Sequence, residues 1–447
     1  MTRFDRWRAA GAEVAVAGLG RSGQAALQLL AARGVRAYGS DRGTPPDAAV
    51  ALEGPLVAID PAGHDLERVA RAAALVVSPG IPPEAPVIAA ARATGREVLS
   101  EAQLGLDGLA GVPAIAVTGT NGKTTTTALV DHLMRHAGRR SVAAGNIGLP
   151  LSMVALDPAP PEWLAVELSS FQLHDMPTLR PTVGVLTNLA PDHLDRYPDL
   201  AAYYADKARL FANANAASIW IHNLDDPDSR EMVAGVAGRH LAFSVRGRAD
   251  AWYDRAAGVL RIGDQPLCAR EAFPLLGDHN VANLLAAALA VHASGVALAR
   301  LTDAPASVQA MPHRLEPVGT VAGVRYINDS KATNLASTRV ALEAMDCPYV
   351  LLLGGRHKGE PYHVLRDVLD RAVAVVAYGE SAPLVVRDLE GLVPVQRVTT
   401  LEEAVARAAE LAPAGGAVLL SPACSSYDQF DNYEQRGERF RALVAAR

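Results

Sequence analysis

The chain is patterned by short apolar runs, each followed by a glycine-containing turn and then by an alanine- and leucine-rich stretch. This succession occurs at residues 14–30, at residues 115–134 and repeatedly after residue 324. The apolar runs predict strands and the Ala/Leu stretches predict helices. Strands that alternate with helices imply βαβ units and parallel sheets, which bind ligands at the carboxyl ends of their strands. We therefore predict an α/β fold.

Length and two interruptions of this pattern predict three domains. The 447 residues are about three times the roughly 150 residues of one domain. A Gly/Leu-rich stretch at 104–113 precedes one strand, and a segment at 303–314 with two prolines precedes another at 324–328. We predict a Rossmann-like domain at 1–110, a central P-loop-type ATPase domain with a mainly parallel sheet at 111–311, and a Rossmann-like domain at 312–447.

Composition excludes some classes of protein. The 42 basic and 48 acidic side chains give a net charge of −6 without a basic block, which argues against binding to nucleic-acid backbone. Three widely spaced cysteines argue against a disulfide framework and a cysteine zinc site. The start does not resemble a signal peptide, and the most apolar segment is interrupted by polar residues. We expect a cytoplasmic protein without membrane insertion.

A first glycine loop follows the strand that begins at Val14. Gly18, Gly20 and Gly23 form G-x-G-x-x-G before a helix, and Asp41 follows the next strand. Taken alone, this motif suggests NAD with Asp41 on a ribose. The alternative is a tight structural turn that binds no dinucleotide. Ser78 ends a third strand and is expected to face the same crevice.

A second glycine-containing loop is the strongest single indication of function in the sequence. It follows a strand at 114–117 and opens a helix, which is the arrangement of a phosphate-binding loop. Lys123 is placed for the β- and γ-phosphates, and the Thr124 hydroxyl for Mg²⁺. Val117 stands where the strict motif has its first glycine. The loop residues are Gly119, Thr120, Asn121, Gly122, Lys123, Thr124 and Thr125.

Two further strand ends are expected beside this loop. One strand runs into Glu167 and another into Asp192 and His193. Carboxylates in such positions hold Mg²⁺, so the residues themselves favour Glu167 and Asp192 over the imidazole of His193. The alternatives are that Glu167 is a capping partner of Ser169 and that residues 192–193 form a loop held by local hydrogen bonds.

Two later helices carry less specific candidates. Lys207, in a predicted helix at 200–213, is by itself more typical of a solvated helix lysine. Asn280 and Asn283 are three residues apart and share one helix face. That face suits either an adenine or a helix cap.

Together these motifs resemble those of the Mur ligases, the ATP-dependent amino-acid-adding enzymes of peptidoglycan synthesis. The resemblance spans essentially the whole chain, with the motifs in the family's order. Its most specific segments are Glu167-Leu-Ser-Ser-Phe-Gln-Leu, Asn328-Asp-Ser-Lys-Ala-Thr-Asn and Ser421-Pro-Ala-Cys-Ser-Ser-Tyr-Asp-Gln-Phe. The member most resembled joins D-glutamate to UDP-N-acetylmuramoyl-L-alanine through an acyl phosphate, releasing ADP and phosphate.

The resemblance implies roles for residues of the first two domains. The first domain is expected to bind the UDP end of the muropeptide rather than NAD. ATP and two Mg²⁺ ions are implied in the central domain, with Thr124, Glu167, His193 and a carbamylated Lys207 as metal ligands. A neutral amine is needed for carbamylation, and burial can supply it. The implied muropeptide contacts are Gly20, Arg21, Ser22, Asp41, Arg42, Ser78 and Asn146.

The third domain is expected to bring the amino acid. Cationic groups suit the two carboxylates of D-glutamate, and Lys331 is also implied in catalysis with Lys123, Glu167, His193 and Lys207. Tyr433 stands where the family often has Phe, and Arg21 where an apolar residue is common. The implied amino-acid contacts are Lys331, Thr333, Lys358, Ser426, Tyr427 and Tyr433, and the implied adenosine contacts are Asn280, Asn283, Arg314 and Asp329.

Three rival interpretations remain at this point. A sibling ligase that adds L-alanine or a folyl-polyglutamate-type enzyme shares the ATP core, but the chain length and residues 421–430 weigh against both. A nucleotide-dependent oxidoreductase explains the first glycine loop and leaves the second without a task. A nonenzymatic ATP-binding regulator leaves Glu167, His193 and Lys331 unexplained.

For the oligomeric state, we expect a monomer.

Overall fold

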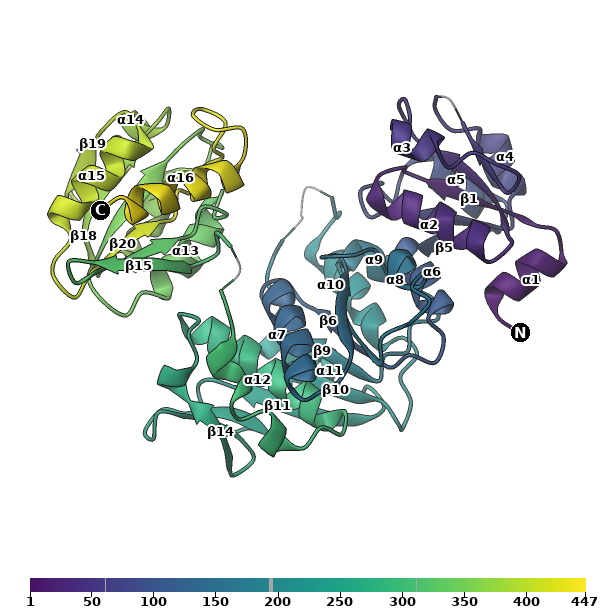
Figure 1. Cartoon of the computed structure of the whole chain (residues 1–447), viewed down its shortest axis with the longest axis horizontal. Helices are drawn as coiled ribbons and strands as arrows, with labels where there is room; N and C mark the ends of the chain where they lie inside the picture. Colours follow the sequence, from purple (N-terminus) through teal and green to yellow (C-terminus); the bar gives the residue numbers. More distant parts are fainter. Residues whose placement is uncertain (61, 193–195, 311) are drawn as a thin grey trace. The chain divides into compact units, whose positions relative to one another are not determined.

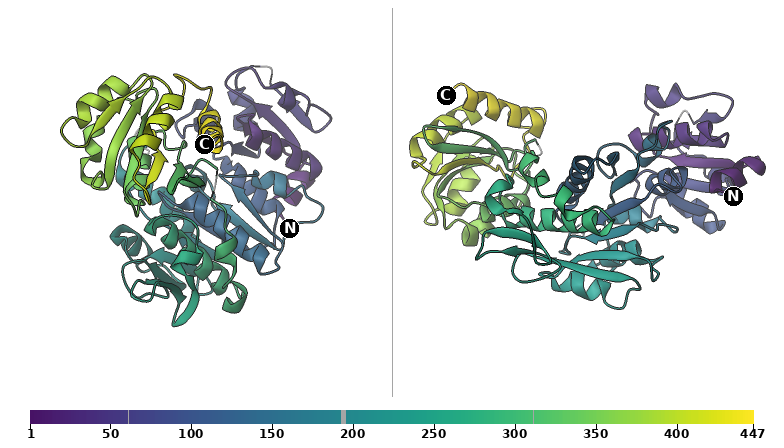
Figure 2. Two further views of the ribbon diagram at one scale, coloured as in Figure 1. Left: turned by 60° about the vertical axis from the view of Figure 1, so that its left-hand side comes forward. Right: turned by 60° about the horizontal axis from the view of Figure 1, so that its bottom comes forward.

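The computed structural model describes residues 1–60, 62–192, 196–310 and 312–447. It contains three separate sheets, each flanked by helices (Figure 1, with two further views in Figure 2). The predicted α/β fold with three sheet-containing domains and mainly parallel sheets is confirmed. Among the helices of these residues, none combines the length and apolarity needed to cross a bilayer.

The first sheet has five parallel strands in the order β3-β2-β1-β4-β5. Val14 and Val16 pack on the side of α2 and α6, whereas Ala15 and Ala17 pack on the side of α4 and α5. Both faces are therefore buried, as parallel sheets require. The elements are α1 (Arg3–Ala9), β1 (Glu13–Ala17), α2 (Arg21–Ala32), β2 (Arg36–Ser40), α3 (Asp47–Val50), β3 (Val57–Ile59), α4 (Leu66–Arg71), β4 (Ala74–Val77), α5 (Pro86–Ala93), β5 (Glu97–Ser100) and α6 (Glu101–Gly108).

The central sheet has the order β14-β13-β12-β11-β10-β9-β6-β8-β7. Its strands are parallel from β7 to β12, and β13 and β14 are antiparallel additions at one edge. The strands are β6 (Ala114–Thr118), β7 (Ser141–Gly145), β8 (Trp163–Glu167), β9 (Val183–Leu186), β10 (Ile219–Asn223), β11 (Arg239–Ser244), β12 (Ala251–Asp254), β13 (Val259–Ile262) and β14 (Gln265–Ala269).

The helices of this region include the one that follows the second glycine loop. They are α7 (Lys123–His136), α8 (Leu151–Val154), α9 (Ser170–His174), α10 (Leu200–Ala208), α11 (Pro227–Val233) and α12 (Asp278–Ala293), with short 3₁₀ turns at Arg209–Phe211, Arg270–Ala272, Leu298–Arg300 and Ala304–Ser307. The helix predicted at 200–213 is thus α-helical only to Ala208. The stretch 104–113, predicted as a connection, is partly helical because α6 extends to Gly108.

The third sheet has the order β15-β16-β20-β17-β18-β19, with β15 antiparallel to β16 and the others parallel. Alternate residues of β17 pack on opposite sides, Leu351 with α13 and α14, and Leu352 with α15 and α16. The elements are β15 (Glu316–Val321), β16 (Val324–Asn328), α13 (Leu335–Glu343), β17 (Tyr349–Gly354), the 3₁₀ segment η5 (Tyr362–Val368), β18 (Ala372–Tyr378), α14 (Ala382–Leu389), β19 (Val395–Arg397), α15 (Leu401–Leu411), β20 (Ala417–Leu420) and α16 (Tyr433–Ala445).

Contacts divide the chain into two compact units, which are described separately below. The first unit contains residues 1–270 and 282–305, and therefore the first two sheets. The second unit contains residues 271–281 and 306–447, and therefore the third sheet. The boundaries proposed at residues 110 and 311 stay predictions.

Candidate functional site

The second glycine loop joins β6 to α7 and depends on a glycine at its end. Gly122 precedes the first helical residue, Lys123, and its φ of +80° lies in the left-handed region. A Cβ atom added to Gly122 would lie 2.3 Å from Oδ1 of Asn283. Any larger residue would therefore combine backbone strain with displacement of the Asn283 side chain. Gly122 lets the backbone turn directly into a helix N-terminus, whose free N–H groups suit an anion.

The two strand ends predicted beside this loop do flank it. In the register of the sheet, Val117 pairs with Glu167 on β8, and Thr118 pairs with Leu186 on β9. Thr187 and Asn188, to which the sequence analysis gave no role, hold the loop from the β9 side. The Thr187 hydroxyl donates to the Asn121 carbonyl at 2.6 Å, and Oδ1 of Asn188 accepts from the Asn121 amide at 2.9 Å. Their signal in the sequence was their position directly after a strand beside a phosphate loop.

Lys207 is buried rather than solvated, so the interpretation from the helix pattern alone is wrong. The side chain is 1% exposed, and its Nζ donates to the Gly119 carbonyl at 2.6 Å. Burial, assisted by the nearby charge of Lys123 and opposed by Asp192, lowers the pKa of Lys207 to about 7. A large share of this amine is therefore neutral near neutral pH, which is the state that carbamylation requires.

Composition held a signal for Lys207 that helical periodicity did not. Of the 42 Lys and Arg residues only four are lysines, at positions 123, 207, 331 and 358. Elsewhere the chain uses arginine for its positive charges. A lysine in such a chain marks a position where arginine cannot replace it, because only lysine offers a compact charge and a pKa that the surroundings readily lower.

Glu167 presents a buried oxygen atom with no hydrogen-bond partner. The residue is 1% exposed; Oε1 accepts from Nδ2 of Asn146 at 2.8 Å, and Oε2 is unsatisfied. Ser169 forms its capping box with Gln172, so Glu167 is not the capping partner of Ser169. A buried anionic oxygen without a partner is costly, and a divalent cation such as Mg²⁺ would satisfy it. The donor set at Glu167 therefore fits the metal that the motif implies.

The remaining metal candidates are less defined. His193 lies outside the described residues. Asp192, the alternative favoured by the residues themselves, has an exposed side chain. Outside positions 61, 193–195 and 311, no group of three or more His, Cys, Asp or Glu side chains is arranged to hold a metal.

The asparagines of α12 are both nearly buried, at 8% exposure for Asn280 and 6% for Asn283. In the first unit, Oδ1 of Asn283 accepts from the Thr126 hydroxyl at 3.2 Å. In the second unit, Nδ2 of Asn280 donates to the Leu276 carbonyl at 2.7 Å. Asn283 thus lies against the loop and the helix that it opens, whereas Asn280 fastens the start of its own helix.

The first glycine loop is closed by its own contacts. A Cβ atom on Gly23 would lie 1.8 Å from the Gly18 carbonyl oxygen, so α2 packs directly on the loop. The Leu19 amide donates to Oδ2 of Asp41 at 2.7 Å, and the Ser78 hydroxyl donates to the Gly18 carbonyl at 2.8 Å. Because the Asp41 carboxylate accepts from the Leu19 amide, this amide is not available to a ligand phosphate as it would be in a dinucleotide-binding loop. The geometry favours the structural turn over a dinucleotide site.

The remaining candidates of this first domain are accessible. Arg21 and Arg42 are exposed, and Ser22 is half-buried at the start of α2. Nη2 of Arg21 lies 3.4 Å from the Gly148 carbonyl, to which it donates. This contact brings the first glycine loop next to the segment that carries Asn146. The candidates that the sequence assigned to one muropeptide site therefore come from neighbouring segments of the first unit.

In the second unit, three strands end together at the amino-acid candidates. Asn328 on β16 pairs with Leu420 on β20, and Leu420 pairs with Leu352 on β17. Lys331 and Thr333 follow β16, Lys358 follows β17, and Ser426 and Tyr427 follow β20. The Lys331 ammonium lies 5.4 Å from the ring centroid of Tyr433, the first residue of α16. Lys358 and Tyr427 are exposed, whereas Ser426 is 2% exposed.

Two buried ionisable groups lie behind this edge of the third sheet. Asp329 accepts from the Ser421 hydroxyl at 2.8 Å and from the Leu315 amide at 3.1 Å. Burial outweighs these bonds and raises the pKa of Asp329 to about 7. Arg436, to which the sequence analysis gave no role, is fully buried and donates to the hydroxyl and carbonyl of Ser330, at 2.9 and 2.8 Å. It therefore fixes the backbone directly before Lys331, while Arg314 is exposed.

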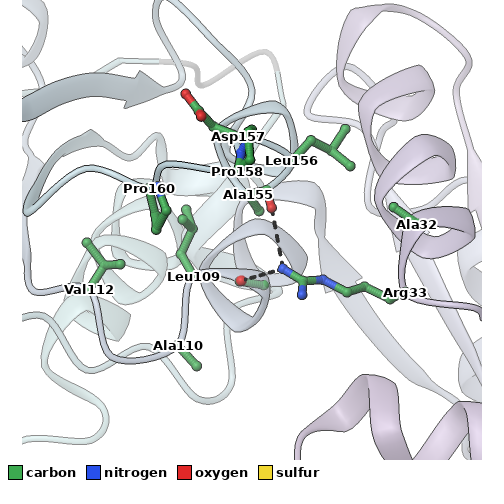
Figure 3. Close-up of a pocket in the computed structure, with 11 residues that line it drawn as sticks. Ala32, Arg33, Leu109, Ala110, Val112, Ala155, Leu156, Asp157, Pro158 and Pro160 are labelled. Carbon is green, nitrogen blue, oxygen red and sulfur yellow. Dashed lines mark hydrogen bonds between the residues drawn. The ribbon is translucent and has the colours of Figure 1, made fainter.

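A cavity elsewhere in the first unit contains none of the predicted residues. It has a volume of about 400 Å³ and lies between the end of α2 and the segments after α6 and α8. Figure 3 shows Arg33 reaching across it, with Nη2 donating to the carbonyls of Gly108 and Ala155 at 3.0 and 3.4 Å. The cavity is lined by Ala32, Arg33, Gly108, Leu109, Ala110, Val112, Ala155, Leu156, Asp157, Pro158 and Pro160.

Comparisons with known proteins match three successive parts of the chain to family models. Residues 12–100 match the Mur ligase MurD-like N-terminal domain, residues 117–291 the Mur ligase middle domain, and residues 313–424 the Mur ligase glutamate ligase domain. Among solved structures, a MurF ligase from Thermotoga maritima in complex with ADP is similar in fold. Its TM-score is 0.60 at 17% identity, over 100% of this chain and 97% of that chain.

Curated relatives match nearly from end to end. The UDP-N-acetylmuramoylalanine–D-glutamate ligase of Salinibacter ruber is 41% identical over 446 residues, covering 96% of both chains. That of Myxococcus xanthus is 41% identical over 458 residues, covering 98% of both. These matches, together with the three family models in order along the sequence, show that the chain is a ligase of the Mur ligase family.

Proposed function

We propose that this ligase joins D-glutamate to UDP-N-acetylmuramoyl-L-alanine, with ATP hydrolysed to ADP and phosphate. The observation that carries the proposal is the end-to-end similarity to relatives named for that reaction, at 41% identity. The use of ATP supports a cytoplasmic location. We propose a monomer.

The first glycine loop and its neighbours form the proposed binding site for the UDP end of the muropeptide. Its candidates are Gly20, Arg21, Ser22, Asp41, Arg42 and Ser78, joined by Asn146 from the central domain. Exposed arginines beside the loop suit the diphosphate of a UDP-sugar. Because the Leu19 amide is bonded to Asp41, we assign the diphosphate to these arginines rather than to the loop amides.

The proposed ATP site is the loop from Gly119 to Thr125. The helix N-terminus and Lys123 would hold phosphate oxygens, and the Thr124 hydroxyl and Glu167 would hold Mg²⁺. We propose two metal ions, with His193 and a carbamylated Lys207 as further ligands. A bound Mg²⁺ supplies charge stabilisation on phosphate oxygens. For adenosine we propose Asn280, Asn283, Arg314 and Asp329.

The proposed amino-acid site lies at the carboxyl ends of the third sheet. Lys331 and Lys358 supply positive charge for the two carboxylates of D-glutamate, with Thr333, Ser426, Tyr427 and Tyr433 beside them. Three of the four lysines of the chain, Lys123, Lys331 and Lys358, fall at proposed phosphate or carboxylate positions, which supports this assignment.

The chemistry follows from the substrates. A carboxylate is unreactive toward an amine, so the alanyl carboxylate first takes the γ-phosphoryl group of ATP and ADP leaves. The amine of D-glutamate then attacks the carbonyl carbon of this acyl phosphate, loses a proton, and phosphate departs from the tetrahedral intermediate. No enzyme nucleophile is required. The side chains act by positioning and by stabilising negative charge, chiefly through Lys123 and Lys331.

The test is ADP release measured against a panel of amino acids. We expect release only when UDP-N-acetylmuramoyl-L-alanine and D-glutamate are both present. L-Glutamate, L-alanine and D-aspartate serve as matched alternatives, and folate derivatives test the sibling activity. ATP hydrolysis without this dual requirement, or a preference for another amino acid, would contradict the proposal.

A further inference from the structure

Two loops of the second unit that carry proposed D-glutamate contacts are joined along their backbones. The loop after β17 holds Lys358, and the loop after β20 holds Ser426. The Gly354 amide donates to the Pro422 carbonyl at 3.1 Å, and the Arg356 amide donates to the Ser425 carbonyl at 2.9 Å. Within the described part of the chain, no further backbone hydrogen bond joins the two loops between Arg356 and Lys358. Side chains must therefore fix the course of the first loop there.

Tyr362, the first residue of η5, provides such a side-chain link. Tyr362 is only 1% exposed, although the segment that it begins directly follows the loop with the exposed Lys358. The hydroxyl oxygen lies 3.1 Å from Nδ1 of His357 and 2.9 Å from Sγ of Cys424. His357 directly precedes Lys358, and Cys424 is two residues before Ser426. One phenol hydroxyl therefore joins both loops.

The surroundings hold this hydroxyl in place. The ring of His357 lies beside that of Tyr362, with centroids 5.4 Å apart and the ring planes tilted by 44°. The Tyr362 amide donates to Oδ2 of Asp388 at 2.9 Å, which fastens the start of η5. Cys424 is fully buried and lies 3.5 Å from the Ser381 hydroxyl. Because a phenol hydroxyl both donates and accepts, Tyr362 can serve the imidazole and the thiol at once.

We propose that the Tyr362 hydroxyl is a positioning group for D-glutamate, setting where Lys358 stands relative to Ser426. A site that grips two carboxylates from two loops tolerates displacements of only about 0.5 Å. The link touches the loops behind the site and not the substrate, so it acts on amino-acid binding alone. This inference rests on the proposed function.

The experiment compares two variants of the second unit, each of which loses one buried tyrosine hydroxyl. Tyr362→Phe, at the start of η5, removes the hydroxyl that links the two loops. Tyr349→Phe removes a hydroxyl at the start of β17, where it donates to the Val368 carbonyl at 3.2 Å, and Tyr349 is fully buried as well. We expect the KM for D-glutamate to rise at least fivefold in Tyr362→Phe. The KM values for ATP and the UDP substrate should stay within twofold, and Tyr349→Phe should change none of the three.

Other outcomes overturn the inference. If folded Tyr362→Phe has an unchanged KM for D-glutamate, or if this KM rises equally in Tyr362→Phe and Tyr349→Phe, the Tyr362 hydroxyl contributes only to packing. Wild-type protein that releases no ADP with D-glutamate would instead refute the proposed function, and the inference with it. If Tyr362→Phe does not fold, Cys424→Ser and Cys424→Ala replace it. Cys424→Ser keeps a hydrogen-bond partner for the Tyr362 hydroxyl and should retain the wild-type KM for D-glutamate. Cys424→Ala removes that partner and should raise this KM. Equal KM values in the two variants would again overturn the inference.

Discussion

Lys123 and Lys207 donate hydrogen bonds to the same carbonyl oxygen, that of Gly119, at 3.0 and 2.6 Å. Two cations that share one acceptor repel each other, and burial of Lys207 adds a desolvation penalty. The second effect is the larger in lowering the pKa of Lys207. An anion held between the two ammonium groups would offset the repulsion. The two lysines therefore favour negative charge at this loop, which the nucleotide proposed at Lys123 and the carbamate proposed at Lys207 would supply.

Replacement of Lys123 by Ala should abolish turnover while the fold is kept. The substitution removes the charge proposed to stabilise the transferred phosphoryl group, and losses of about 100-fold or more are typical of such groups. ADP release measures the loss, and far-UV circular dichroism and thermal unfolding report the fold. Lys123→Arg is the matched control. If it restores most of the turnover, a positive charge alone suffices and the compact ammonium has no special role.

Replacement of Lys207 by Ala should remove activity that short-chain carboxylates partly restore. A carboxylate that enters the space left by the side chain would replace the proposed carbamate, so acetate or propionate should raise ADP release about tenfold or more. Lys207→Arg is the control, because its guanidinium fills the space and admits no carboxylate. Absence of rescue in Lys207→Ala would count against carbamylation.

The mainly parallel arrangement of the strands and the sheet edge at which the candidate residues lie could be predicted from the sequence, for a physical reason. Parallel strands end at a common edge, so residues placed directly after strands, such as Glu167 and Ser78, fall where the βαβ pattern puts them. No comparable rule predicts whether one particular side chain of a helix is buried. The pattern at 200–213 carried no information on which face of the helix points to the phosphate loop, and Lys207 was accordingly misjudged.

Long-range partners were the other part that the sequence could not supply. Arg436 reaches Ser330 across about a hundred residues of chain, and Tyr362 reaches Cys424 across 62. Neither pair has a spacing rule, since each depends on how two loops fold over one sheet edge. The count of four lysines is the exception. This property of composition marks all four lysines, Lys207 among them, without any knowledge of their neighbours.

Glu167→Gln should raise the Mg²⁺ concentration needed for half-maximal activity about tenfold or more. The amide keeps an oxygen for Asn146 and loses the buried charge that suits the metal. Calorimetry of nucleotide binding with and without Mg²⁺ gives a readout independent of turnover, and the metal-dependent gain in affinity should shrink.

Glu101→Gln is the matched control for this change. Glu101 is also 1% exposed with one unsatisfied oxygen, but it accepts from the Ser152 amide at 2.6 Å, away from the phosphate loop. Its replacement should leave the Mg²⁺ dependence unaltered. A similar shift in both variants would mean that any buried glutamate in this unit affects the metal requirement, and Glu167 would lose its proposed role.

Gly122→Ala should weaken nucleotide binding at least tenfold. An alanine at positive φ costs about 1–2 kcal/mol, and its Cβ would also displace Asn283 from the loop. Gly111→Ala separates these effects, because Gly111 has a φ of +93° and nothing within 4 Å of an added Cβ. Both variants should lose thermal stability, measured by calorimetry, but only Gly122→Ala should lose affinity for ATP. Equal losses of affinity would assign the effect to strain rather than to Asn283.

Asp329 should make the second unit less stable as the pH rises from about 4 to 7. Its pKa is raised by burial from 3.8 to about 7, so across this window the folded protein holds a proton that the unfolded chain has released. Stability attributable to this group therefore falls as pH increases, with a limiting slope of about 1.4 kcal/mol per pH unit. Asp329→Asn cannot titrate, so its stability should lack this decline. Hydrogen exchange of the β16 amides at several pH values measures the difference.

Asp367→Asn tests whether the effect belongs to burial rather than to any missing aspartate. A hydrogen bond from Arg339 lowers the pKa of Asp367 to about 2, so its stabilising effect is lost only as the pH falls below 3.8. Between pH 4.5 and 7 this variant should differ from the wild type by a constant amount, whereas the difference for Asp329→Asn should change steadily. Parallel profiles for all three proteins would mean that Asp329 is ionised in the fold, and that Ser421 and the Leu315 amide outweigh its desolvation. The proposed adenosine contact would then carry a full negative charge, which changes what it can accept from the nucleotide.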